Sequence, residues 1–158
     1  MARSRWTPRR LRRFVRLDGE RRALLVEAAL WLLVTRLALA LVPFASLARR
    51  LGSFVPPTDL RVAQARASGP REHVELAREI GWAVTRAARH VPYRAVCLPQ
   101  AMAARIMLRR RGVPSVLHFG AAKGAEKPLD THAWLSAAGV EVTGFPVAEN
   151  FAEIACFV

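Results

Sequence analysis

The chain has 158 residues, 53% of them hydrophobic, which is enough for one domain with a real core. Its 25 basic residues outnumber its 12 acidic ones, and the formal net charge of +13 is almost wholly due to arginine. Such an excess favours acidic partners. With only two cysteines and no cleavable signal pattern, the composition argues against a disulfide-stabilised secreted domain and favours a reducing cytoplasm.

The chain begins with its densest basic cluster, residues 1–22, in which nine arginines are opposed only by Asp18 and Glu20. Such a segment fits a nucleic-acid arm, a membrane-surface anchor, a docking site for an acidic peptide, or simply a solvated arm. Only Trp6 and Phe14 could stack on bases, and no nucleic-acid-binding motif follows. We therefore expect no specific nucleic-acid partner.

Residues 23–48 form the most apolar part of the chain. A bilayer span needs about 20 residues with few charges, but Glu27 and Arg36 leave only residues 28–35 free of charge between them. These embedded charges also argue against a secretion signal. The pattern predicts a helix, ended or kinked by Pro43, that packs on the domain or lies at a membrane surface.

Proline and glycine then mark a boundary. Residues 53–70 contain Pro56-Pro57 and Ser68-Gly69-Pro70 and show little periodicity. We predict a basic arm and apolar helix over residues 1–52, a linker over residues 53–70, and the main domain over residues 71–158.

The main domain changes its periodicity halfway. Helical spacing over residues 71–90 and 98–111 gives way to alternation after Pro114. The alternating segments predict four strands, at residues 115–121, 129–137, 140–145 and 152–158. Helices followed by an antiparallel sheet make an α+β fold.

The chemistry-bearing residues of this domain are Cys97 and His132. Pro99 places Cys97 at the beginning of the second helix, where free backbone N–H groups favour a thiolate. His132 opens a strand and could act as the base for a cysteine nucleophile. The alternative is a buried structural cysteine, which is how we interpret Cys156 in its apolar tail.

Three motifs carry a family resemblance: VPYRAVCLPQA at residues 91–101, LRRRGVP at 108–114 and THAWL at 131–135. Together they closely resemble the B2 proteins of lasso peptide biosynthesis, which are leader peptidases with a transglutaminase-like core. The likeness covers residues 79–158 well, and residues 21–52 resemble the N-terminal part of stand-alone members.

The resemblance implies a function. The protein would be a cysteine peptidase that removes the leader from a lasso peptide precursor, with Cys97 attacking the scissile carbonyl and His132 moving the proton. The Cys97 backbone N–H and a second donor would hold the oxyanion. The implied partners are the precursor leader, a separate leader-binding protein and a lasso cyclase, with no cofactor and no metal.

The chain departs from the family in its third catalytic group. Members commonly place an aspartate about a dozen residues beyond the histidine, and residues 142–144 here read Val-Thr-Gly. If a two-residue turn precedes the next strand, Glu141 and Thr143 share the face of His132, as does Asp130. We predict Asp130 as the orienting acid, with Glu141 as the alternative and Thr143 as a weaker one. A Cys-His dyad can also work.

The remaining histidines have simpler interpretations. His118 is expected as a half-buried strand residue rather than a cleft residue, and His73 and His90 as solvated residues at helix ends. None has metal-ligand spacing with Cys97 or Cys156, so we expect no zinc site.

A second function stays open: a non-catalytic peptide-binding or scaffold member of the same fold. We expect a cytoplasmic protein in either case, with a peripheral membrane contact through the N-terminal segment as a further interpretation.

Overall fold

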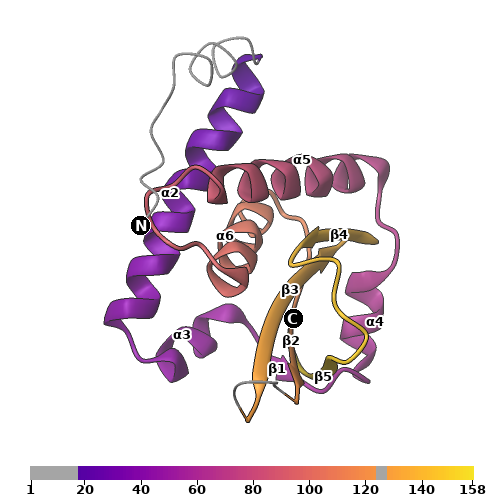
Figure 1. Ribbon diagram of the computed structural model, residues 1–158. Helices are drawn as coiled ribbons and strands as arrows, with labels where there is room; N and C mark the ends of the chain where they lie inside the picture. Colours follow the sequence, from indigo (N-terminus) through magenta and orange to yellow (C-terminus); the bar gives the residue numbers. More distant parts are fainter. Residues whose placement is uncertain (1–17, 124–127) are drawn as a thin grey trace.

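The computed structural model describes residues 18–123 and 128–158. A five-stranded sheet forms the middle of the molecule (Figure 1). Helices α5 (Arg71–Ala88) and α6 (Cys97–Arg109) cover one face of this sheet, α2 (Gly19–Leu41) lies beyond them, and α4 (Leu60–Arg66) lies against the other face. The predicted α+β architecture, with N-terminal helices and the helix that begins at Cys97 packed on an antiparallel sheet, is confirmed.

The predicted helices are present, and a short helix that was not predicted lies among residues 53–70. The helices are α2 (Gly19–Leu41), α3 (Phe44–Leu51), α4 (Leu60–Arg66), α5 (Arg71–Ala88) and α6 (Cys97–Arg109). Helix α2 begins where the Asp18 side chain accepts a hydrogen bond from the Arg21 N–H at 2.8 Å. It ends before Pro43, as predicted, because the residue preceding a proline is pushed out of the helical region.

The strands are β1 (Phe54–Val55), β2 (Val116–Ala122), β3 (Asp130–Ala137), β4 (Val140–Thr143) and β5 (Ala152–Phe157). Their order in the sheet is β1-β5-β2-β3-β4, and every neighbouring pair is antiparallel. The four predicted strands are confirmed, and each of their ends lies within two residues of the predicted one.

Residues 53–70, expected as a linker, carry the two short elements β1 and α4. Phe54 and Val55 pair with β5, and Val62 of α4 is buried. Elements of two and seven residues are too short to produce a readable period. The division of the chain into domains at residues 52 and 70 stays a prediction.

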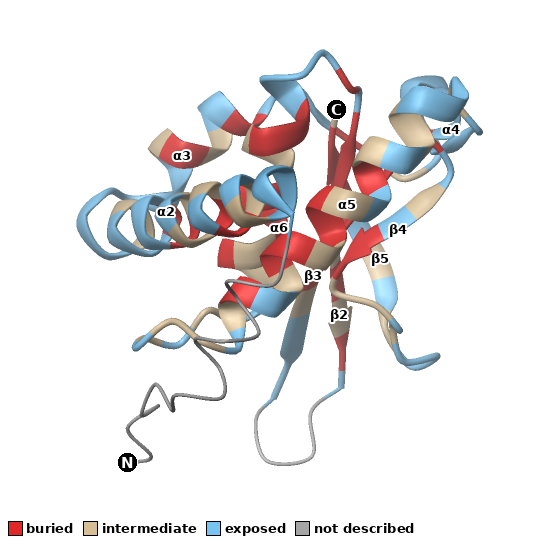
Figure 2. Ribbon diagram, turned by 90° about the horizontal axis from the view of Figure 1, so that it is seen from above, coloured by how far each residue is buried: buried red, intermediate tan, exposed pale blue. Residues whose placement is uncertain are grey.

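The sheet separates two clusters of buried residues. The main cluster lies between the sheet and the helices α2, α5 and α6, and includes Leu32, Ile80, Met107, Leu108, Leu117 and Leu135. The smaller cluster lies under α4 and consists of Val55, Val62, Val116 and Cys156. Figure 2 shows the buried residues gathered between α5, α6 and the strands. Each fully buried leucine or isoleucine contributes about 1.5–3 kcal/mol of transfer free energy.

Helix α2 packs on the domain along one of its sides. Its buried residues are Leu25, Ala28, Leu32 and Thr35. The Thr35 hydroxyl donates to the Pro99 carbonyl in the first turn of α6 at 3.2 Å, and Glu27 pairs with Arg111 at 2.6 Å. Among the described residues, α2 is the one helix long and apolar enough to cross a membrane.

Candidate active site

Cys97 is the first residue of α6, as the sequence predicts. The preceding residue, Val96, provides no side-chain cap for the backbone N–H groups of the first turn. The Gln100 side chain donates to the Ala95 carbonyl at 2.6 Å and fixes the turn that leads into the helix. Cys97 is half-buried and packs against the main core. The thiol of Cys97 therefore lies, partly accessible, at the uncapped N-terminus of a helix.

His132 is the third residue of β3 and is half-buried. Its Nε2 atom lies 2.6 Å from the carbonyl oxygen of Gly144. Because a carbonyl only accepts, Nε2 carries a proton and donates it, and in the neutral ring Nδ1 is left as an acceptor. The imidazole stacks on Trp134 with ring centroids 5.8 Å apart, and Phe151 flanks it at 5.6 Å.

Cys97 and His132 are not in hydrogen-bonding contact. Within residues 18–123 and 128–158, no hydrogen bond joins the Cys97 sulfur to the imidazole. Along β3 the side chains of Ala133 and Leu135 enter the main core beneath α6. His132 and Trp134 alternate with them and therefore belong to the other face of the sheet. Each residue occupies its predicted element, and their catalytic pairing stays a prediction.

The carboxylates proposed to orient His132 are both exposed. In the described part of the chain, neither Asp130 nor Glu141 forms a hydrogen bond with the imidazole. Glu141 is opposite Ser136 in the sheet, which keeps it on the His132 face. The roles of both carboxylates stay predictions, and among the described residues the Gly144 carbonyl is the group that hydrogen-bonds to the ring.

Thr143 was predicted on the face of His132, and this is wrong. A β-bulge between Leu135 and Ser136 inserts one residue into β4, so that Thr143 is opposite Leu135. Thr143 is 2% exposed, and its hydroxyl is the buried side-chain oxygen for which the described residues provide no partner. It therefore cannot orient His132.

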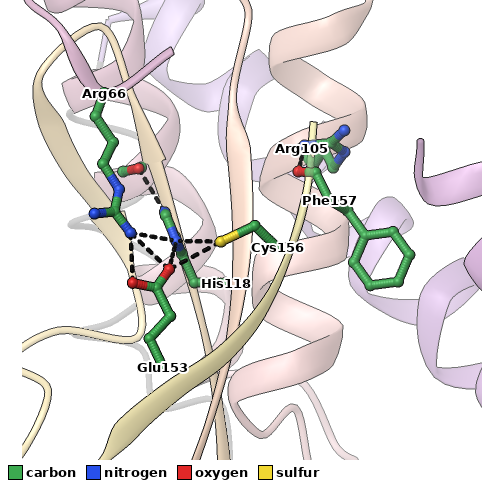
Figure 3. Close-up of polar contacts among 7 residues, drawn as sticks. Arg66, Arg105, His118, Glu153, Cys156 and Phe157 are labelled. Carbon is green, nitrogen blue, oxygen red and sulfur yellow. Dashed lines mark hydrogen bonds and ion pairs between the residues drawn. The ribbon is translucent and has the colours of Figure 1, made fainter. Parts of the chain in front are cut away.

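A polar network that the sequence did not reveal lies on the α4 face of the sheet (Figure 3). Glu153 accepts from the Cys156 thiol at 2.9 Å and contacts His118 Nδ1 at 2.5 Å. His118 Nε2 accepts from the Ser136 hydroxyl at 2.7 Å, and Arg66 of α4 pairs with Glu153 at 2.6 Å. The network joins α4 to β2, β3 and β5. Its members are far apart in sequence, so spacing alone could not have found it.

The protonation of this network follows from burial. Burial lowers the pKa of His118, with the hydrogen bond and the charge of Glu153 opposing part of that shift. His118 is therefore neutral at pH 7, with its Nδ1 proton donated to Glu153. Burial, together with the adjacent carboxylate, raises the pKa of Cys156 to about 12, so its thiol stays protonated and unreactive.

The described residues contain one group of potential metal ligands, which belongs to this network. It consists of His118, Glu153 and Cys156, whose ligand atoms lie within 4.8 Å of one another. Spacing along the sequence gave no metal-ligand pair with Cys156, but the fold brings His118 beside it. However, Arg66 binds both Glu153 oxygens, at 2.6 and 2.7 Å, and already balances the carboxylate. The donor set fits a closed hydrogen-bond network better than a cation site.

Comparison with protein families gives a match to the transglutaminase-like superfamily over residues 38–156. The match spans more than half of the chain and runs from the last residues of α2 into β5, including both Cys97 and His132. No curated protein and no solved structure matches the chain significantly.

Proposed function

The chain belongs to the transglutaminase-like superfamily, and from this premise we propose that it is a cysteine peptidase that removes the leader from a lasso peptide precursor. The observation that carries the proposal is the place of Cys97, half-buried at the uncapped N-terminus of α6. The fold of the superfamily is consistent with that of cysteine peptidases. The choice of substrate rests on the motifs around Cys97 and His132.

The proposed reaction uses two groups of the chain. His132 first takes the proton of the Cys97 thiol. The thiolate then attacks the scissile carbonyl carbon, a C–S bond forms, and the oxyanion is held by the Cys97 backbone N–H. When the C–N bond breaks, His132 gives its proton to the leaving amine, which becomes the free N-terminus of the core peptide. Water then attacks the thioester with His132 as base, which releases the leader as a carboxylate and restores the thiol.

This mechanism needs the imidazole to reach the thiol when substrate is bound. The free Nδ1 of His132 supports the role of base, because Nε2 is occupied by the Gly144 carbonyl. Catalytic hydrogen bonds are often absent or long without substrate and form only in the substrate complex. Because His132 belongs to the face of the sheet away from α6, the proposal requires the start of β3 to rearrange on peptide binding, so that the imidazole leaves this face and reaches the thiol.

The substrate class defines the partners and the compartment. A precursor leader would be presented by a separate leader-binding protein, and the freed amine would be used by a lasso cyclase. Both cysteines of the chain are free thiols, which supports a reducing cytoplasm. No nucleic acid and no cofactor enters the reaction.

A second candidate function is a non-catalytic peptide-binding member of the same superfamily. Two observations favour it: Cys97 and His132 form no hydrogen bond in the described residues, and glycine stands at position 144, where the lasso family commonly has an aspartate.

The two functions differ in a cleavage assay. The full chain is incubated with the precursor peptide and the leader-binding protein of the same gene neighbourhood, and products are identified by mass spectrometry. We expect cleavage by the wild type, none by Cys97→Ala, and near-normal cleavage by Cys156→Ala, the matched thiol deletion. Undiminished cleavage by Cys97→Ala would refute the assignment, whereas precursor binding without cleavage by the wild type would establish the binding function.

A further inference from the structure

Helix α2 has a second apolar side that packs on no described part of the chain. Its members are Val26, Leu30, Leu33, Val34, Leu37 and Leu41, which are between 41% and 79% exposed. At 100° per residue these six positions fall on one face, diametrically opposite the buried residues of the helix. We call this surface the outer face of α2. In Figure 2 the outward side of α2 is exposed, at the edge of the molecule.

A continuous apolar stripe of this size needs a partner. Single exposed leucines are normal on soluble proteins, but contiguous patches mark interaction surfaces. The 23 residues of α2 extend over about 34 Å. A helix that is apolar on nearly all sides is typical of one enclosed on both sides. The domain encloses one side of α2 and leaves the outer face open.

The charges around this face identify the kind of partner. Arg22 lies on α2 at one border of the outer face, and Arg36, which is exposed, lies between this border and the buried side of the helix. Arg49 and Arg50, also exposed, follow in α3. The sequence that precedes α2, residues 1–17, contains seven further arginines and no acidic residue. Apolar side chains bordered by arginines match a lipid surface with anionic headgroups.

We propose that the outer face of α2 lies in the headgroup and acyl boundary of an anionic bilayer, with the bordering arginines bound to lipid phosphates. The catalytic domain then stays outside the bilayer. Six leucine and valine side chains provide the hydrophobic part of the binding, and the arginines restrict it to anionic surfaces. This proposal does not depend on the proposed peptidase activity.

The contacts of α2 require that it lie along the bilayer and not across it. The Tyr93 hydroxyl donates to the Ala29 carbonyl at 3.1 Å, and Glu27 pairs with Arg111. Together with the bond from Thr35 to α6, these contacts hold α2 to the domain over its central turns. A membrane-spanning α2 would have to break them and carry the Glu27 carboxylate into hydrocarbon.

The test is flotation of the full chain with lipid vesicles. Vesicles of phosphatidylglycerol and phosphatidylcholine are compared with pure phosphatidylcholine at low and high salt. The test variant combines Leu30→Asn, Leu33→Asn and Leu37→Asn. The matched control places the same change at three exposed apolar positions away from α2: Leu60→Asn, Leu129→Asn and Ile154→Asn. Circular dichroism and thermal unfolding check that both variants keep the fold.

We expect the wild type and the control to float with the anionic vesicles, weakly at high salt, and the α2 variant to bind at least tenfold less. Equal flotation of the α2 variant and the wild type would overturn the proposal, as would a wild type that stays unbound. Light scattering without lipid measures the oligomeric state and so tests the alternative partner of the outer face, a second copy of the chain. A wild-type dimer that the α2 variant converts to monomer would assign the outer face to a second copy of the chain and overturn the lipid proposal.

Discussion

The Nε2 atom of His132 donates to the carbonyl oxygen of Gly144 at 2.6 Å, so a backbone group and not a carboxylate hydrogen-bonds to the ring. A carbonyl fixes the orientation and the tautomer of an imidazole as a carboxylate does, but it brings no full negative charge to stabilise the imidazolium. The chain therefore positions the His132 imidazole without an acid.

If the carbonyl is the orienting group, the carboxylates near His132 are dispensable. We expect Asp130→Asn, Glu141→Gln and the double variant to cleave precursor within about twofold of the wild-type rate, since both residues are exposed and away from the ring. His132→Ala should lower the rate by at least about 10². Single-turnover cleavage followed by mass spectrometry measures these rates. A tenfold lower cleavage rate in either amide variant would show that the replaced carboxylate orients His132.

Gly144 should tolerate no side chain. Its φ is +83°, and a Cβ there would lie 2.6 Å from the Ala133 carbonyl oxygen and 2.8 Å from Trp134. Gly112 is the matched control, because its φ is +72° but nothing lies within 4 Å of its Cβ position. Gly112→Ala should cost about 1–2 kcal/mol of unfolding free energy from backbone strain alone. Gly144→Ala should cost about 3 kcal/mol or more, because the clash is added. Urea unfolding measures both, and equal losses would contradict the packing described around Trp134.

The stability of the fold should depend on pH through His118. Burial lowers its pKa in the folded protein below the ordinary value of 6.5, so below pH 6.5 the unfolded chain binds a proton that the folded protein does not. This contribution is complete above about pH 6.5 and is lost as the pH falls through the folded pKa, at up to about 1.4 kcal/mol per pH unit. Urea unfolding at pH 7.5, 6.5 and 5.5 should show a smaller dependence in His118→Gln than in the wild type.

The matched control for this prediction is His73→Gln, which removes a histidine of α5 outside the network. A pH dependence that survives in His118→Gln and disappears in His73→Gln would show that the buried network is not its source.

Thr143 offers a test of the bulge in β4. Its hydroxyl is buried without a partner, so Thr143→Val should raise the unfolding free energy by about 1 kcal/mol. Thr35→Val should lower it by about 1 kcal/mol, because the equally buried Thr35 hydroxyl bonds to carbonyls of α2 and α6. Thermal and urea unfolding compare the two valine variants. A destabilised Thr143→Val would mean that the hydroxyl has a partner and that the register near the bulge differs.

Local sequence determined most of the elements that carry the site. Pro43 ended α2 and Pro99 placed Cys97 in the first turn of α6, because proline restricts its own backbone and that of the preceding residue wherever it occurs. Alternation located the four longer strands, since a side-chain period of two is a property of each strand alone. The resemblance of three short motifs to a known family predicted a transglutaminase-like core, and the family match confirms this superfamily.

Only the tertiary structure decided how those elements meet. The bulge beside Leu135 turned Thr143 into the core, and the pairing of β2 with β5 brought His118 to Cys156 across 38 positions of sequence. The tertiary structure also placed His132 within hydrogen-bonding distance of the Gly144 carbonyl. It left one side of α2 exposed. These outcomes depend on register and on contacts between distant segments. Composition, spacing and local periodicity do not encode either, because the free energy that selects them comes from packing among segments that the sequence keeps apart.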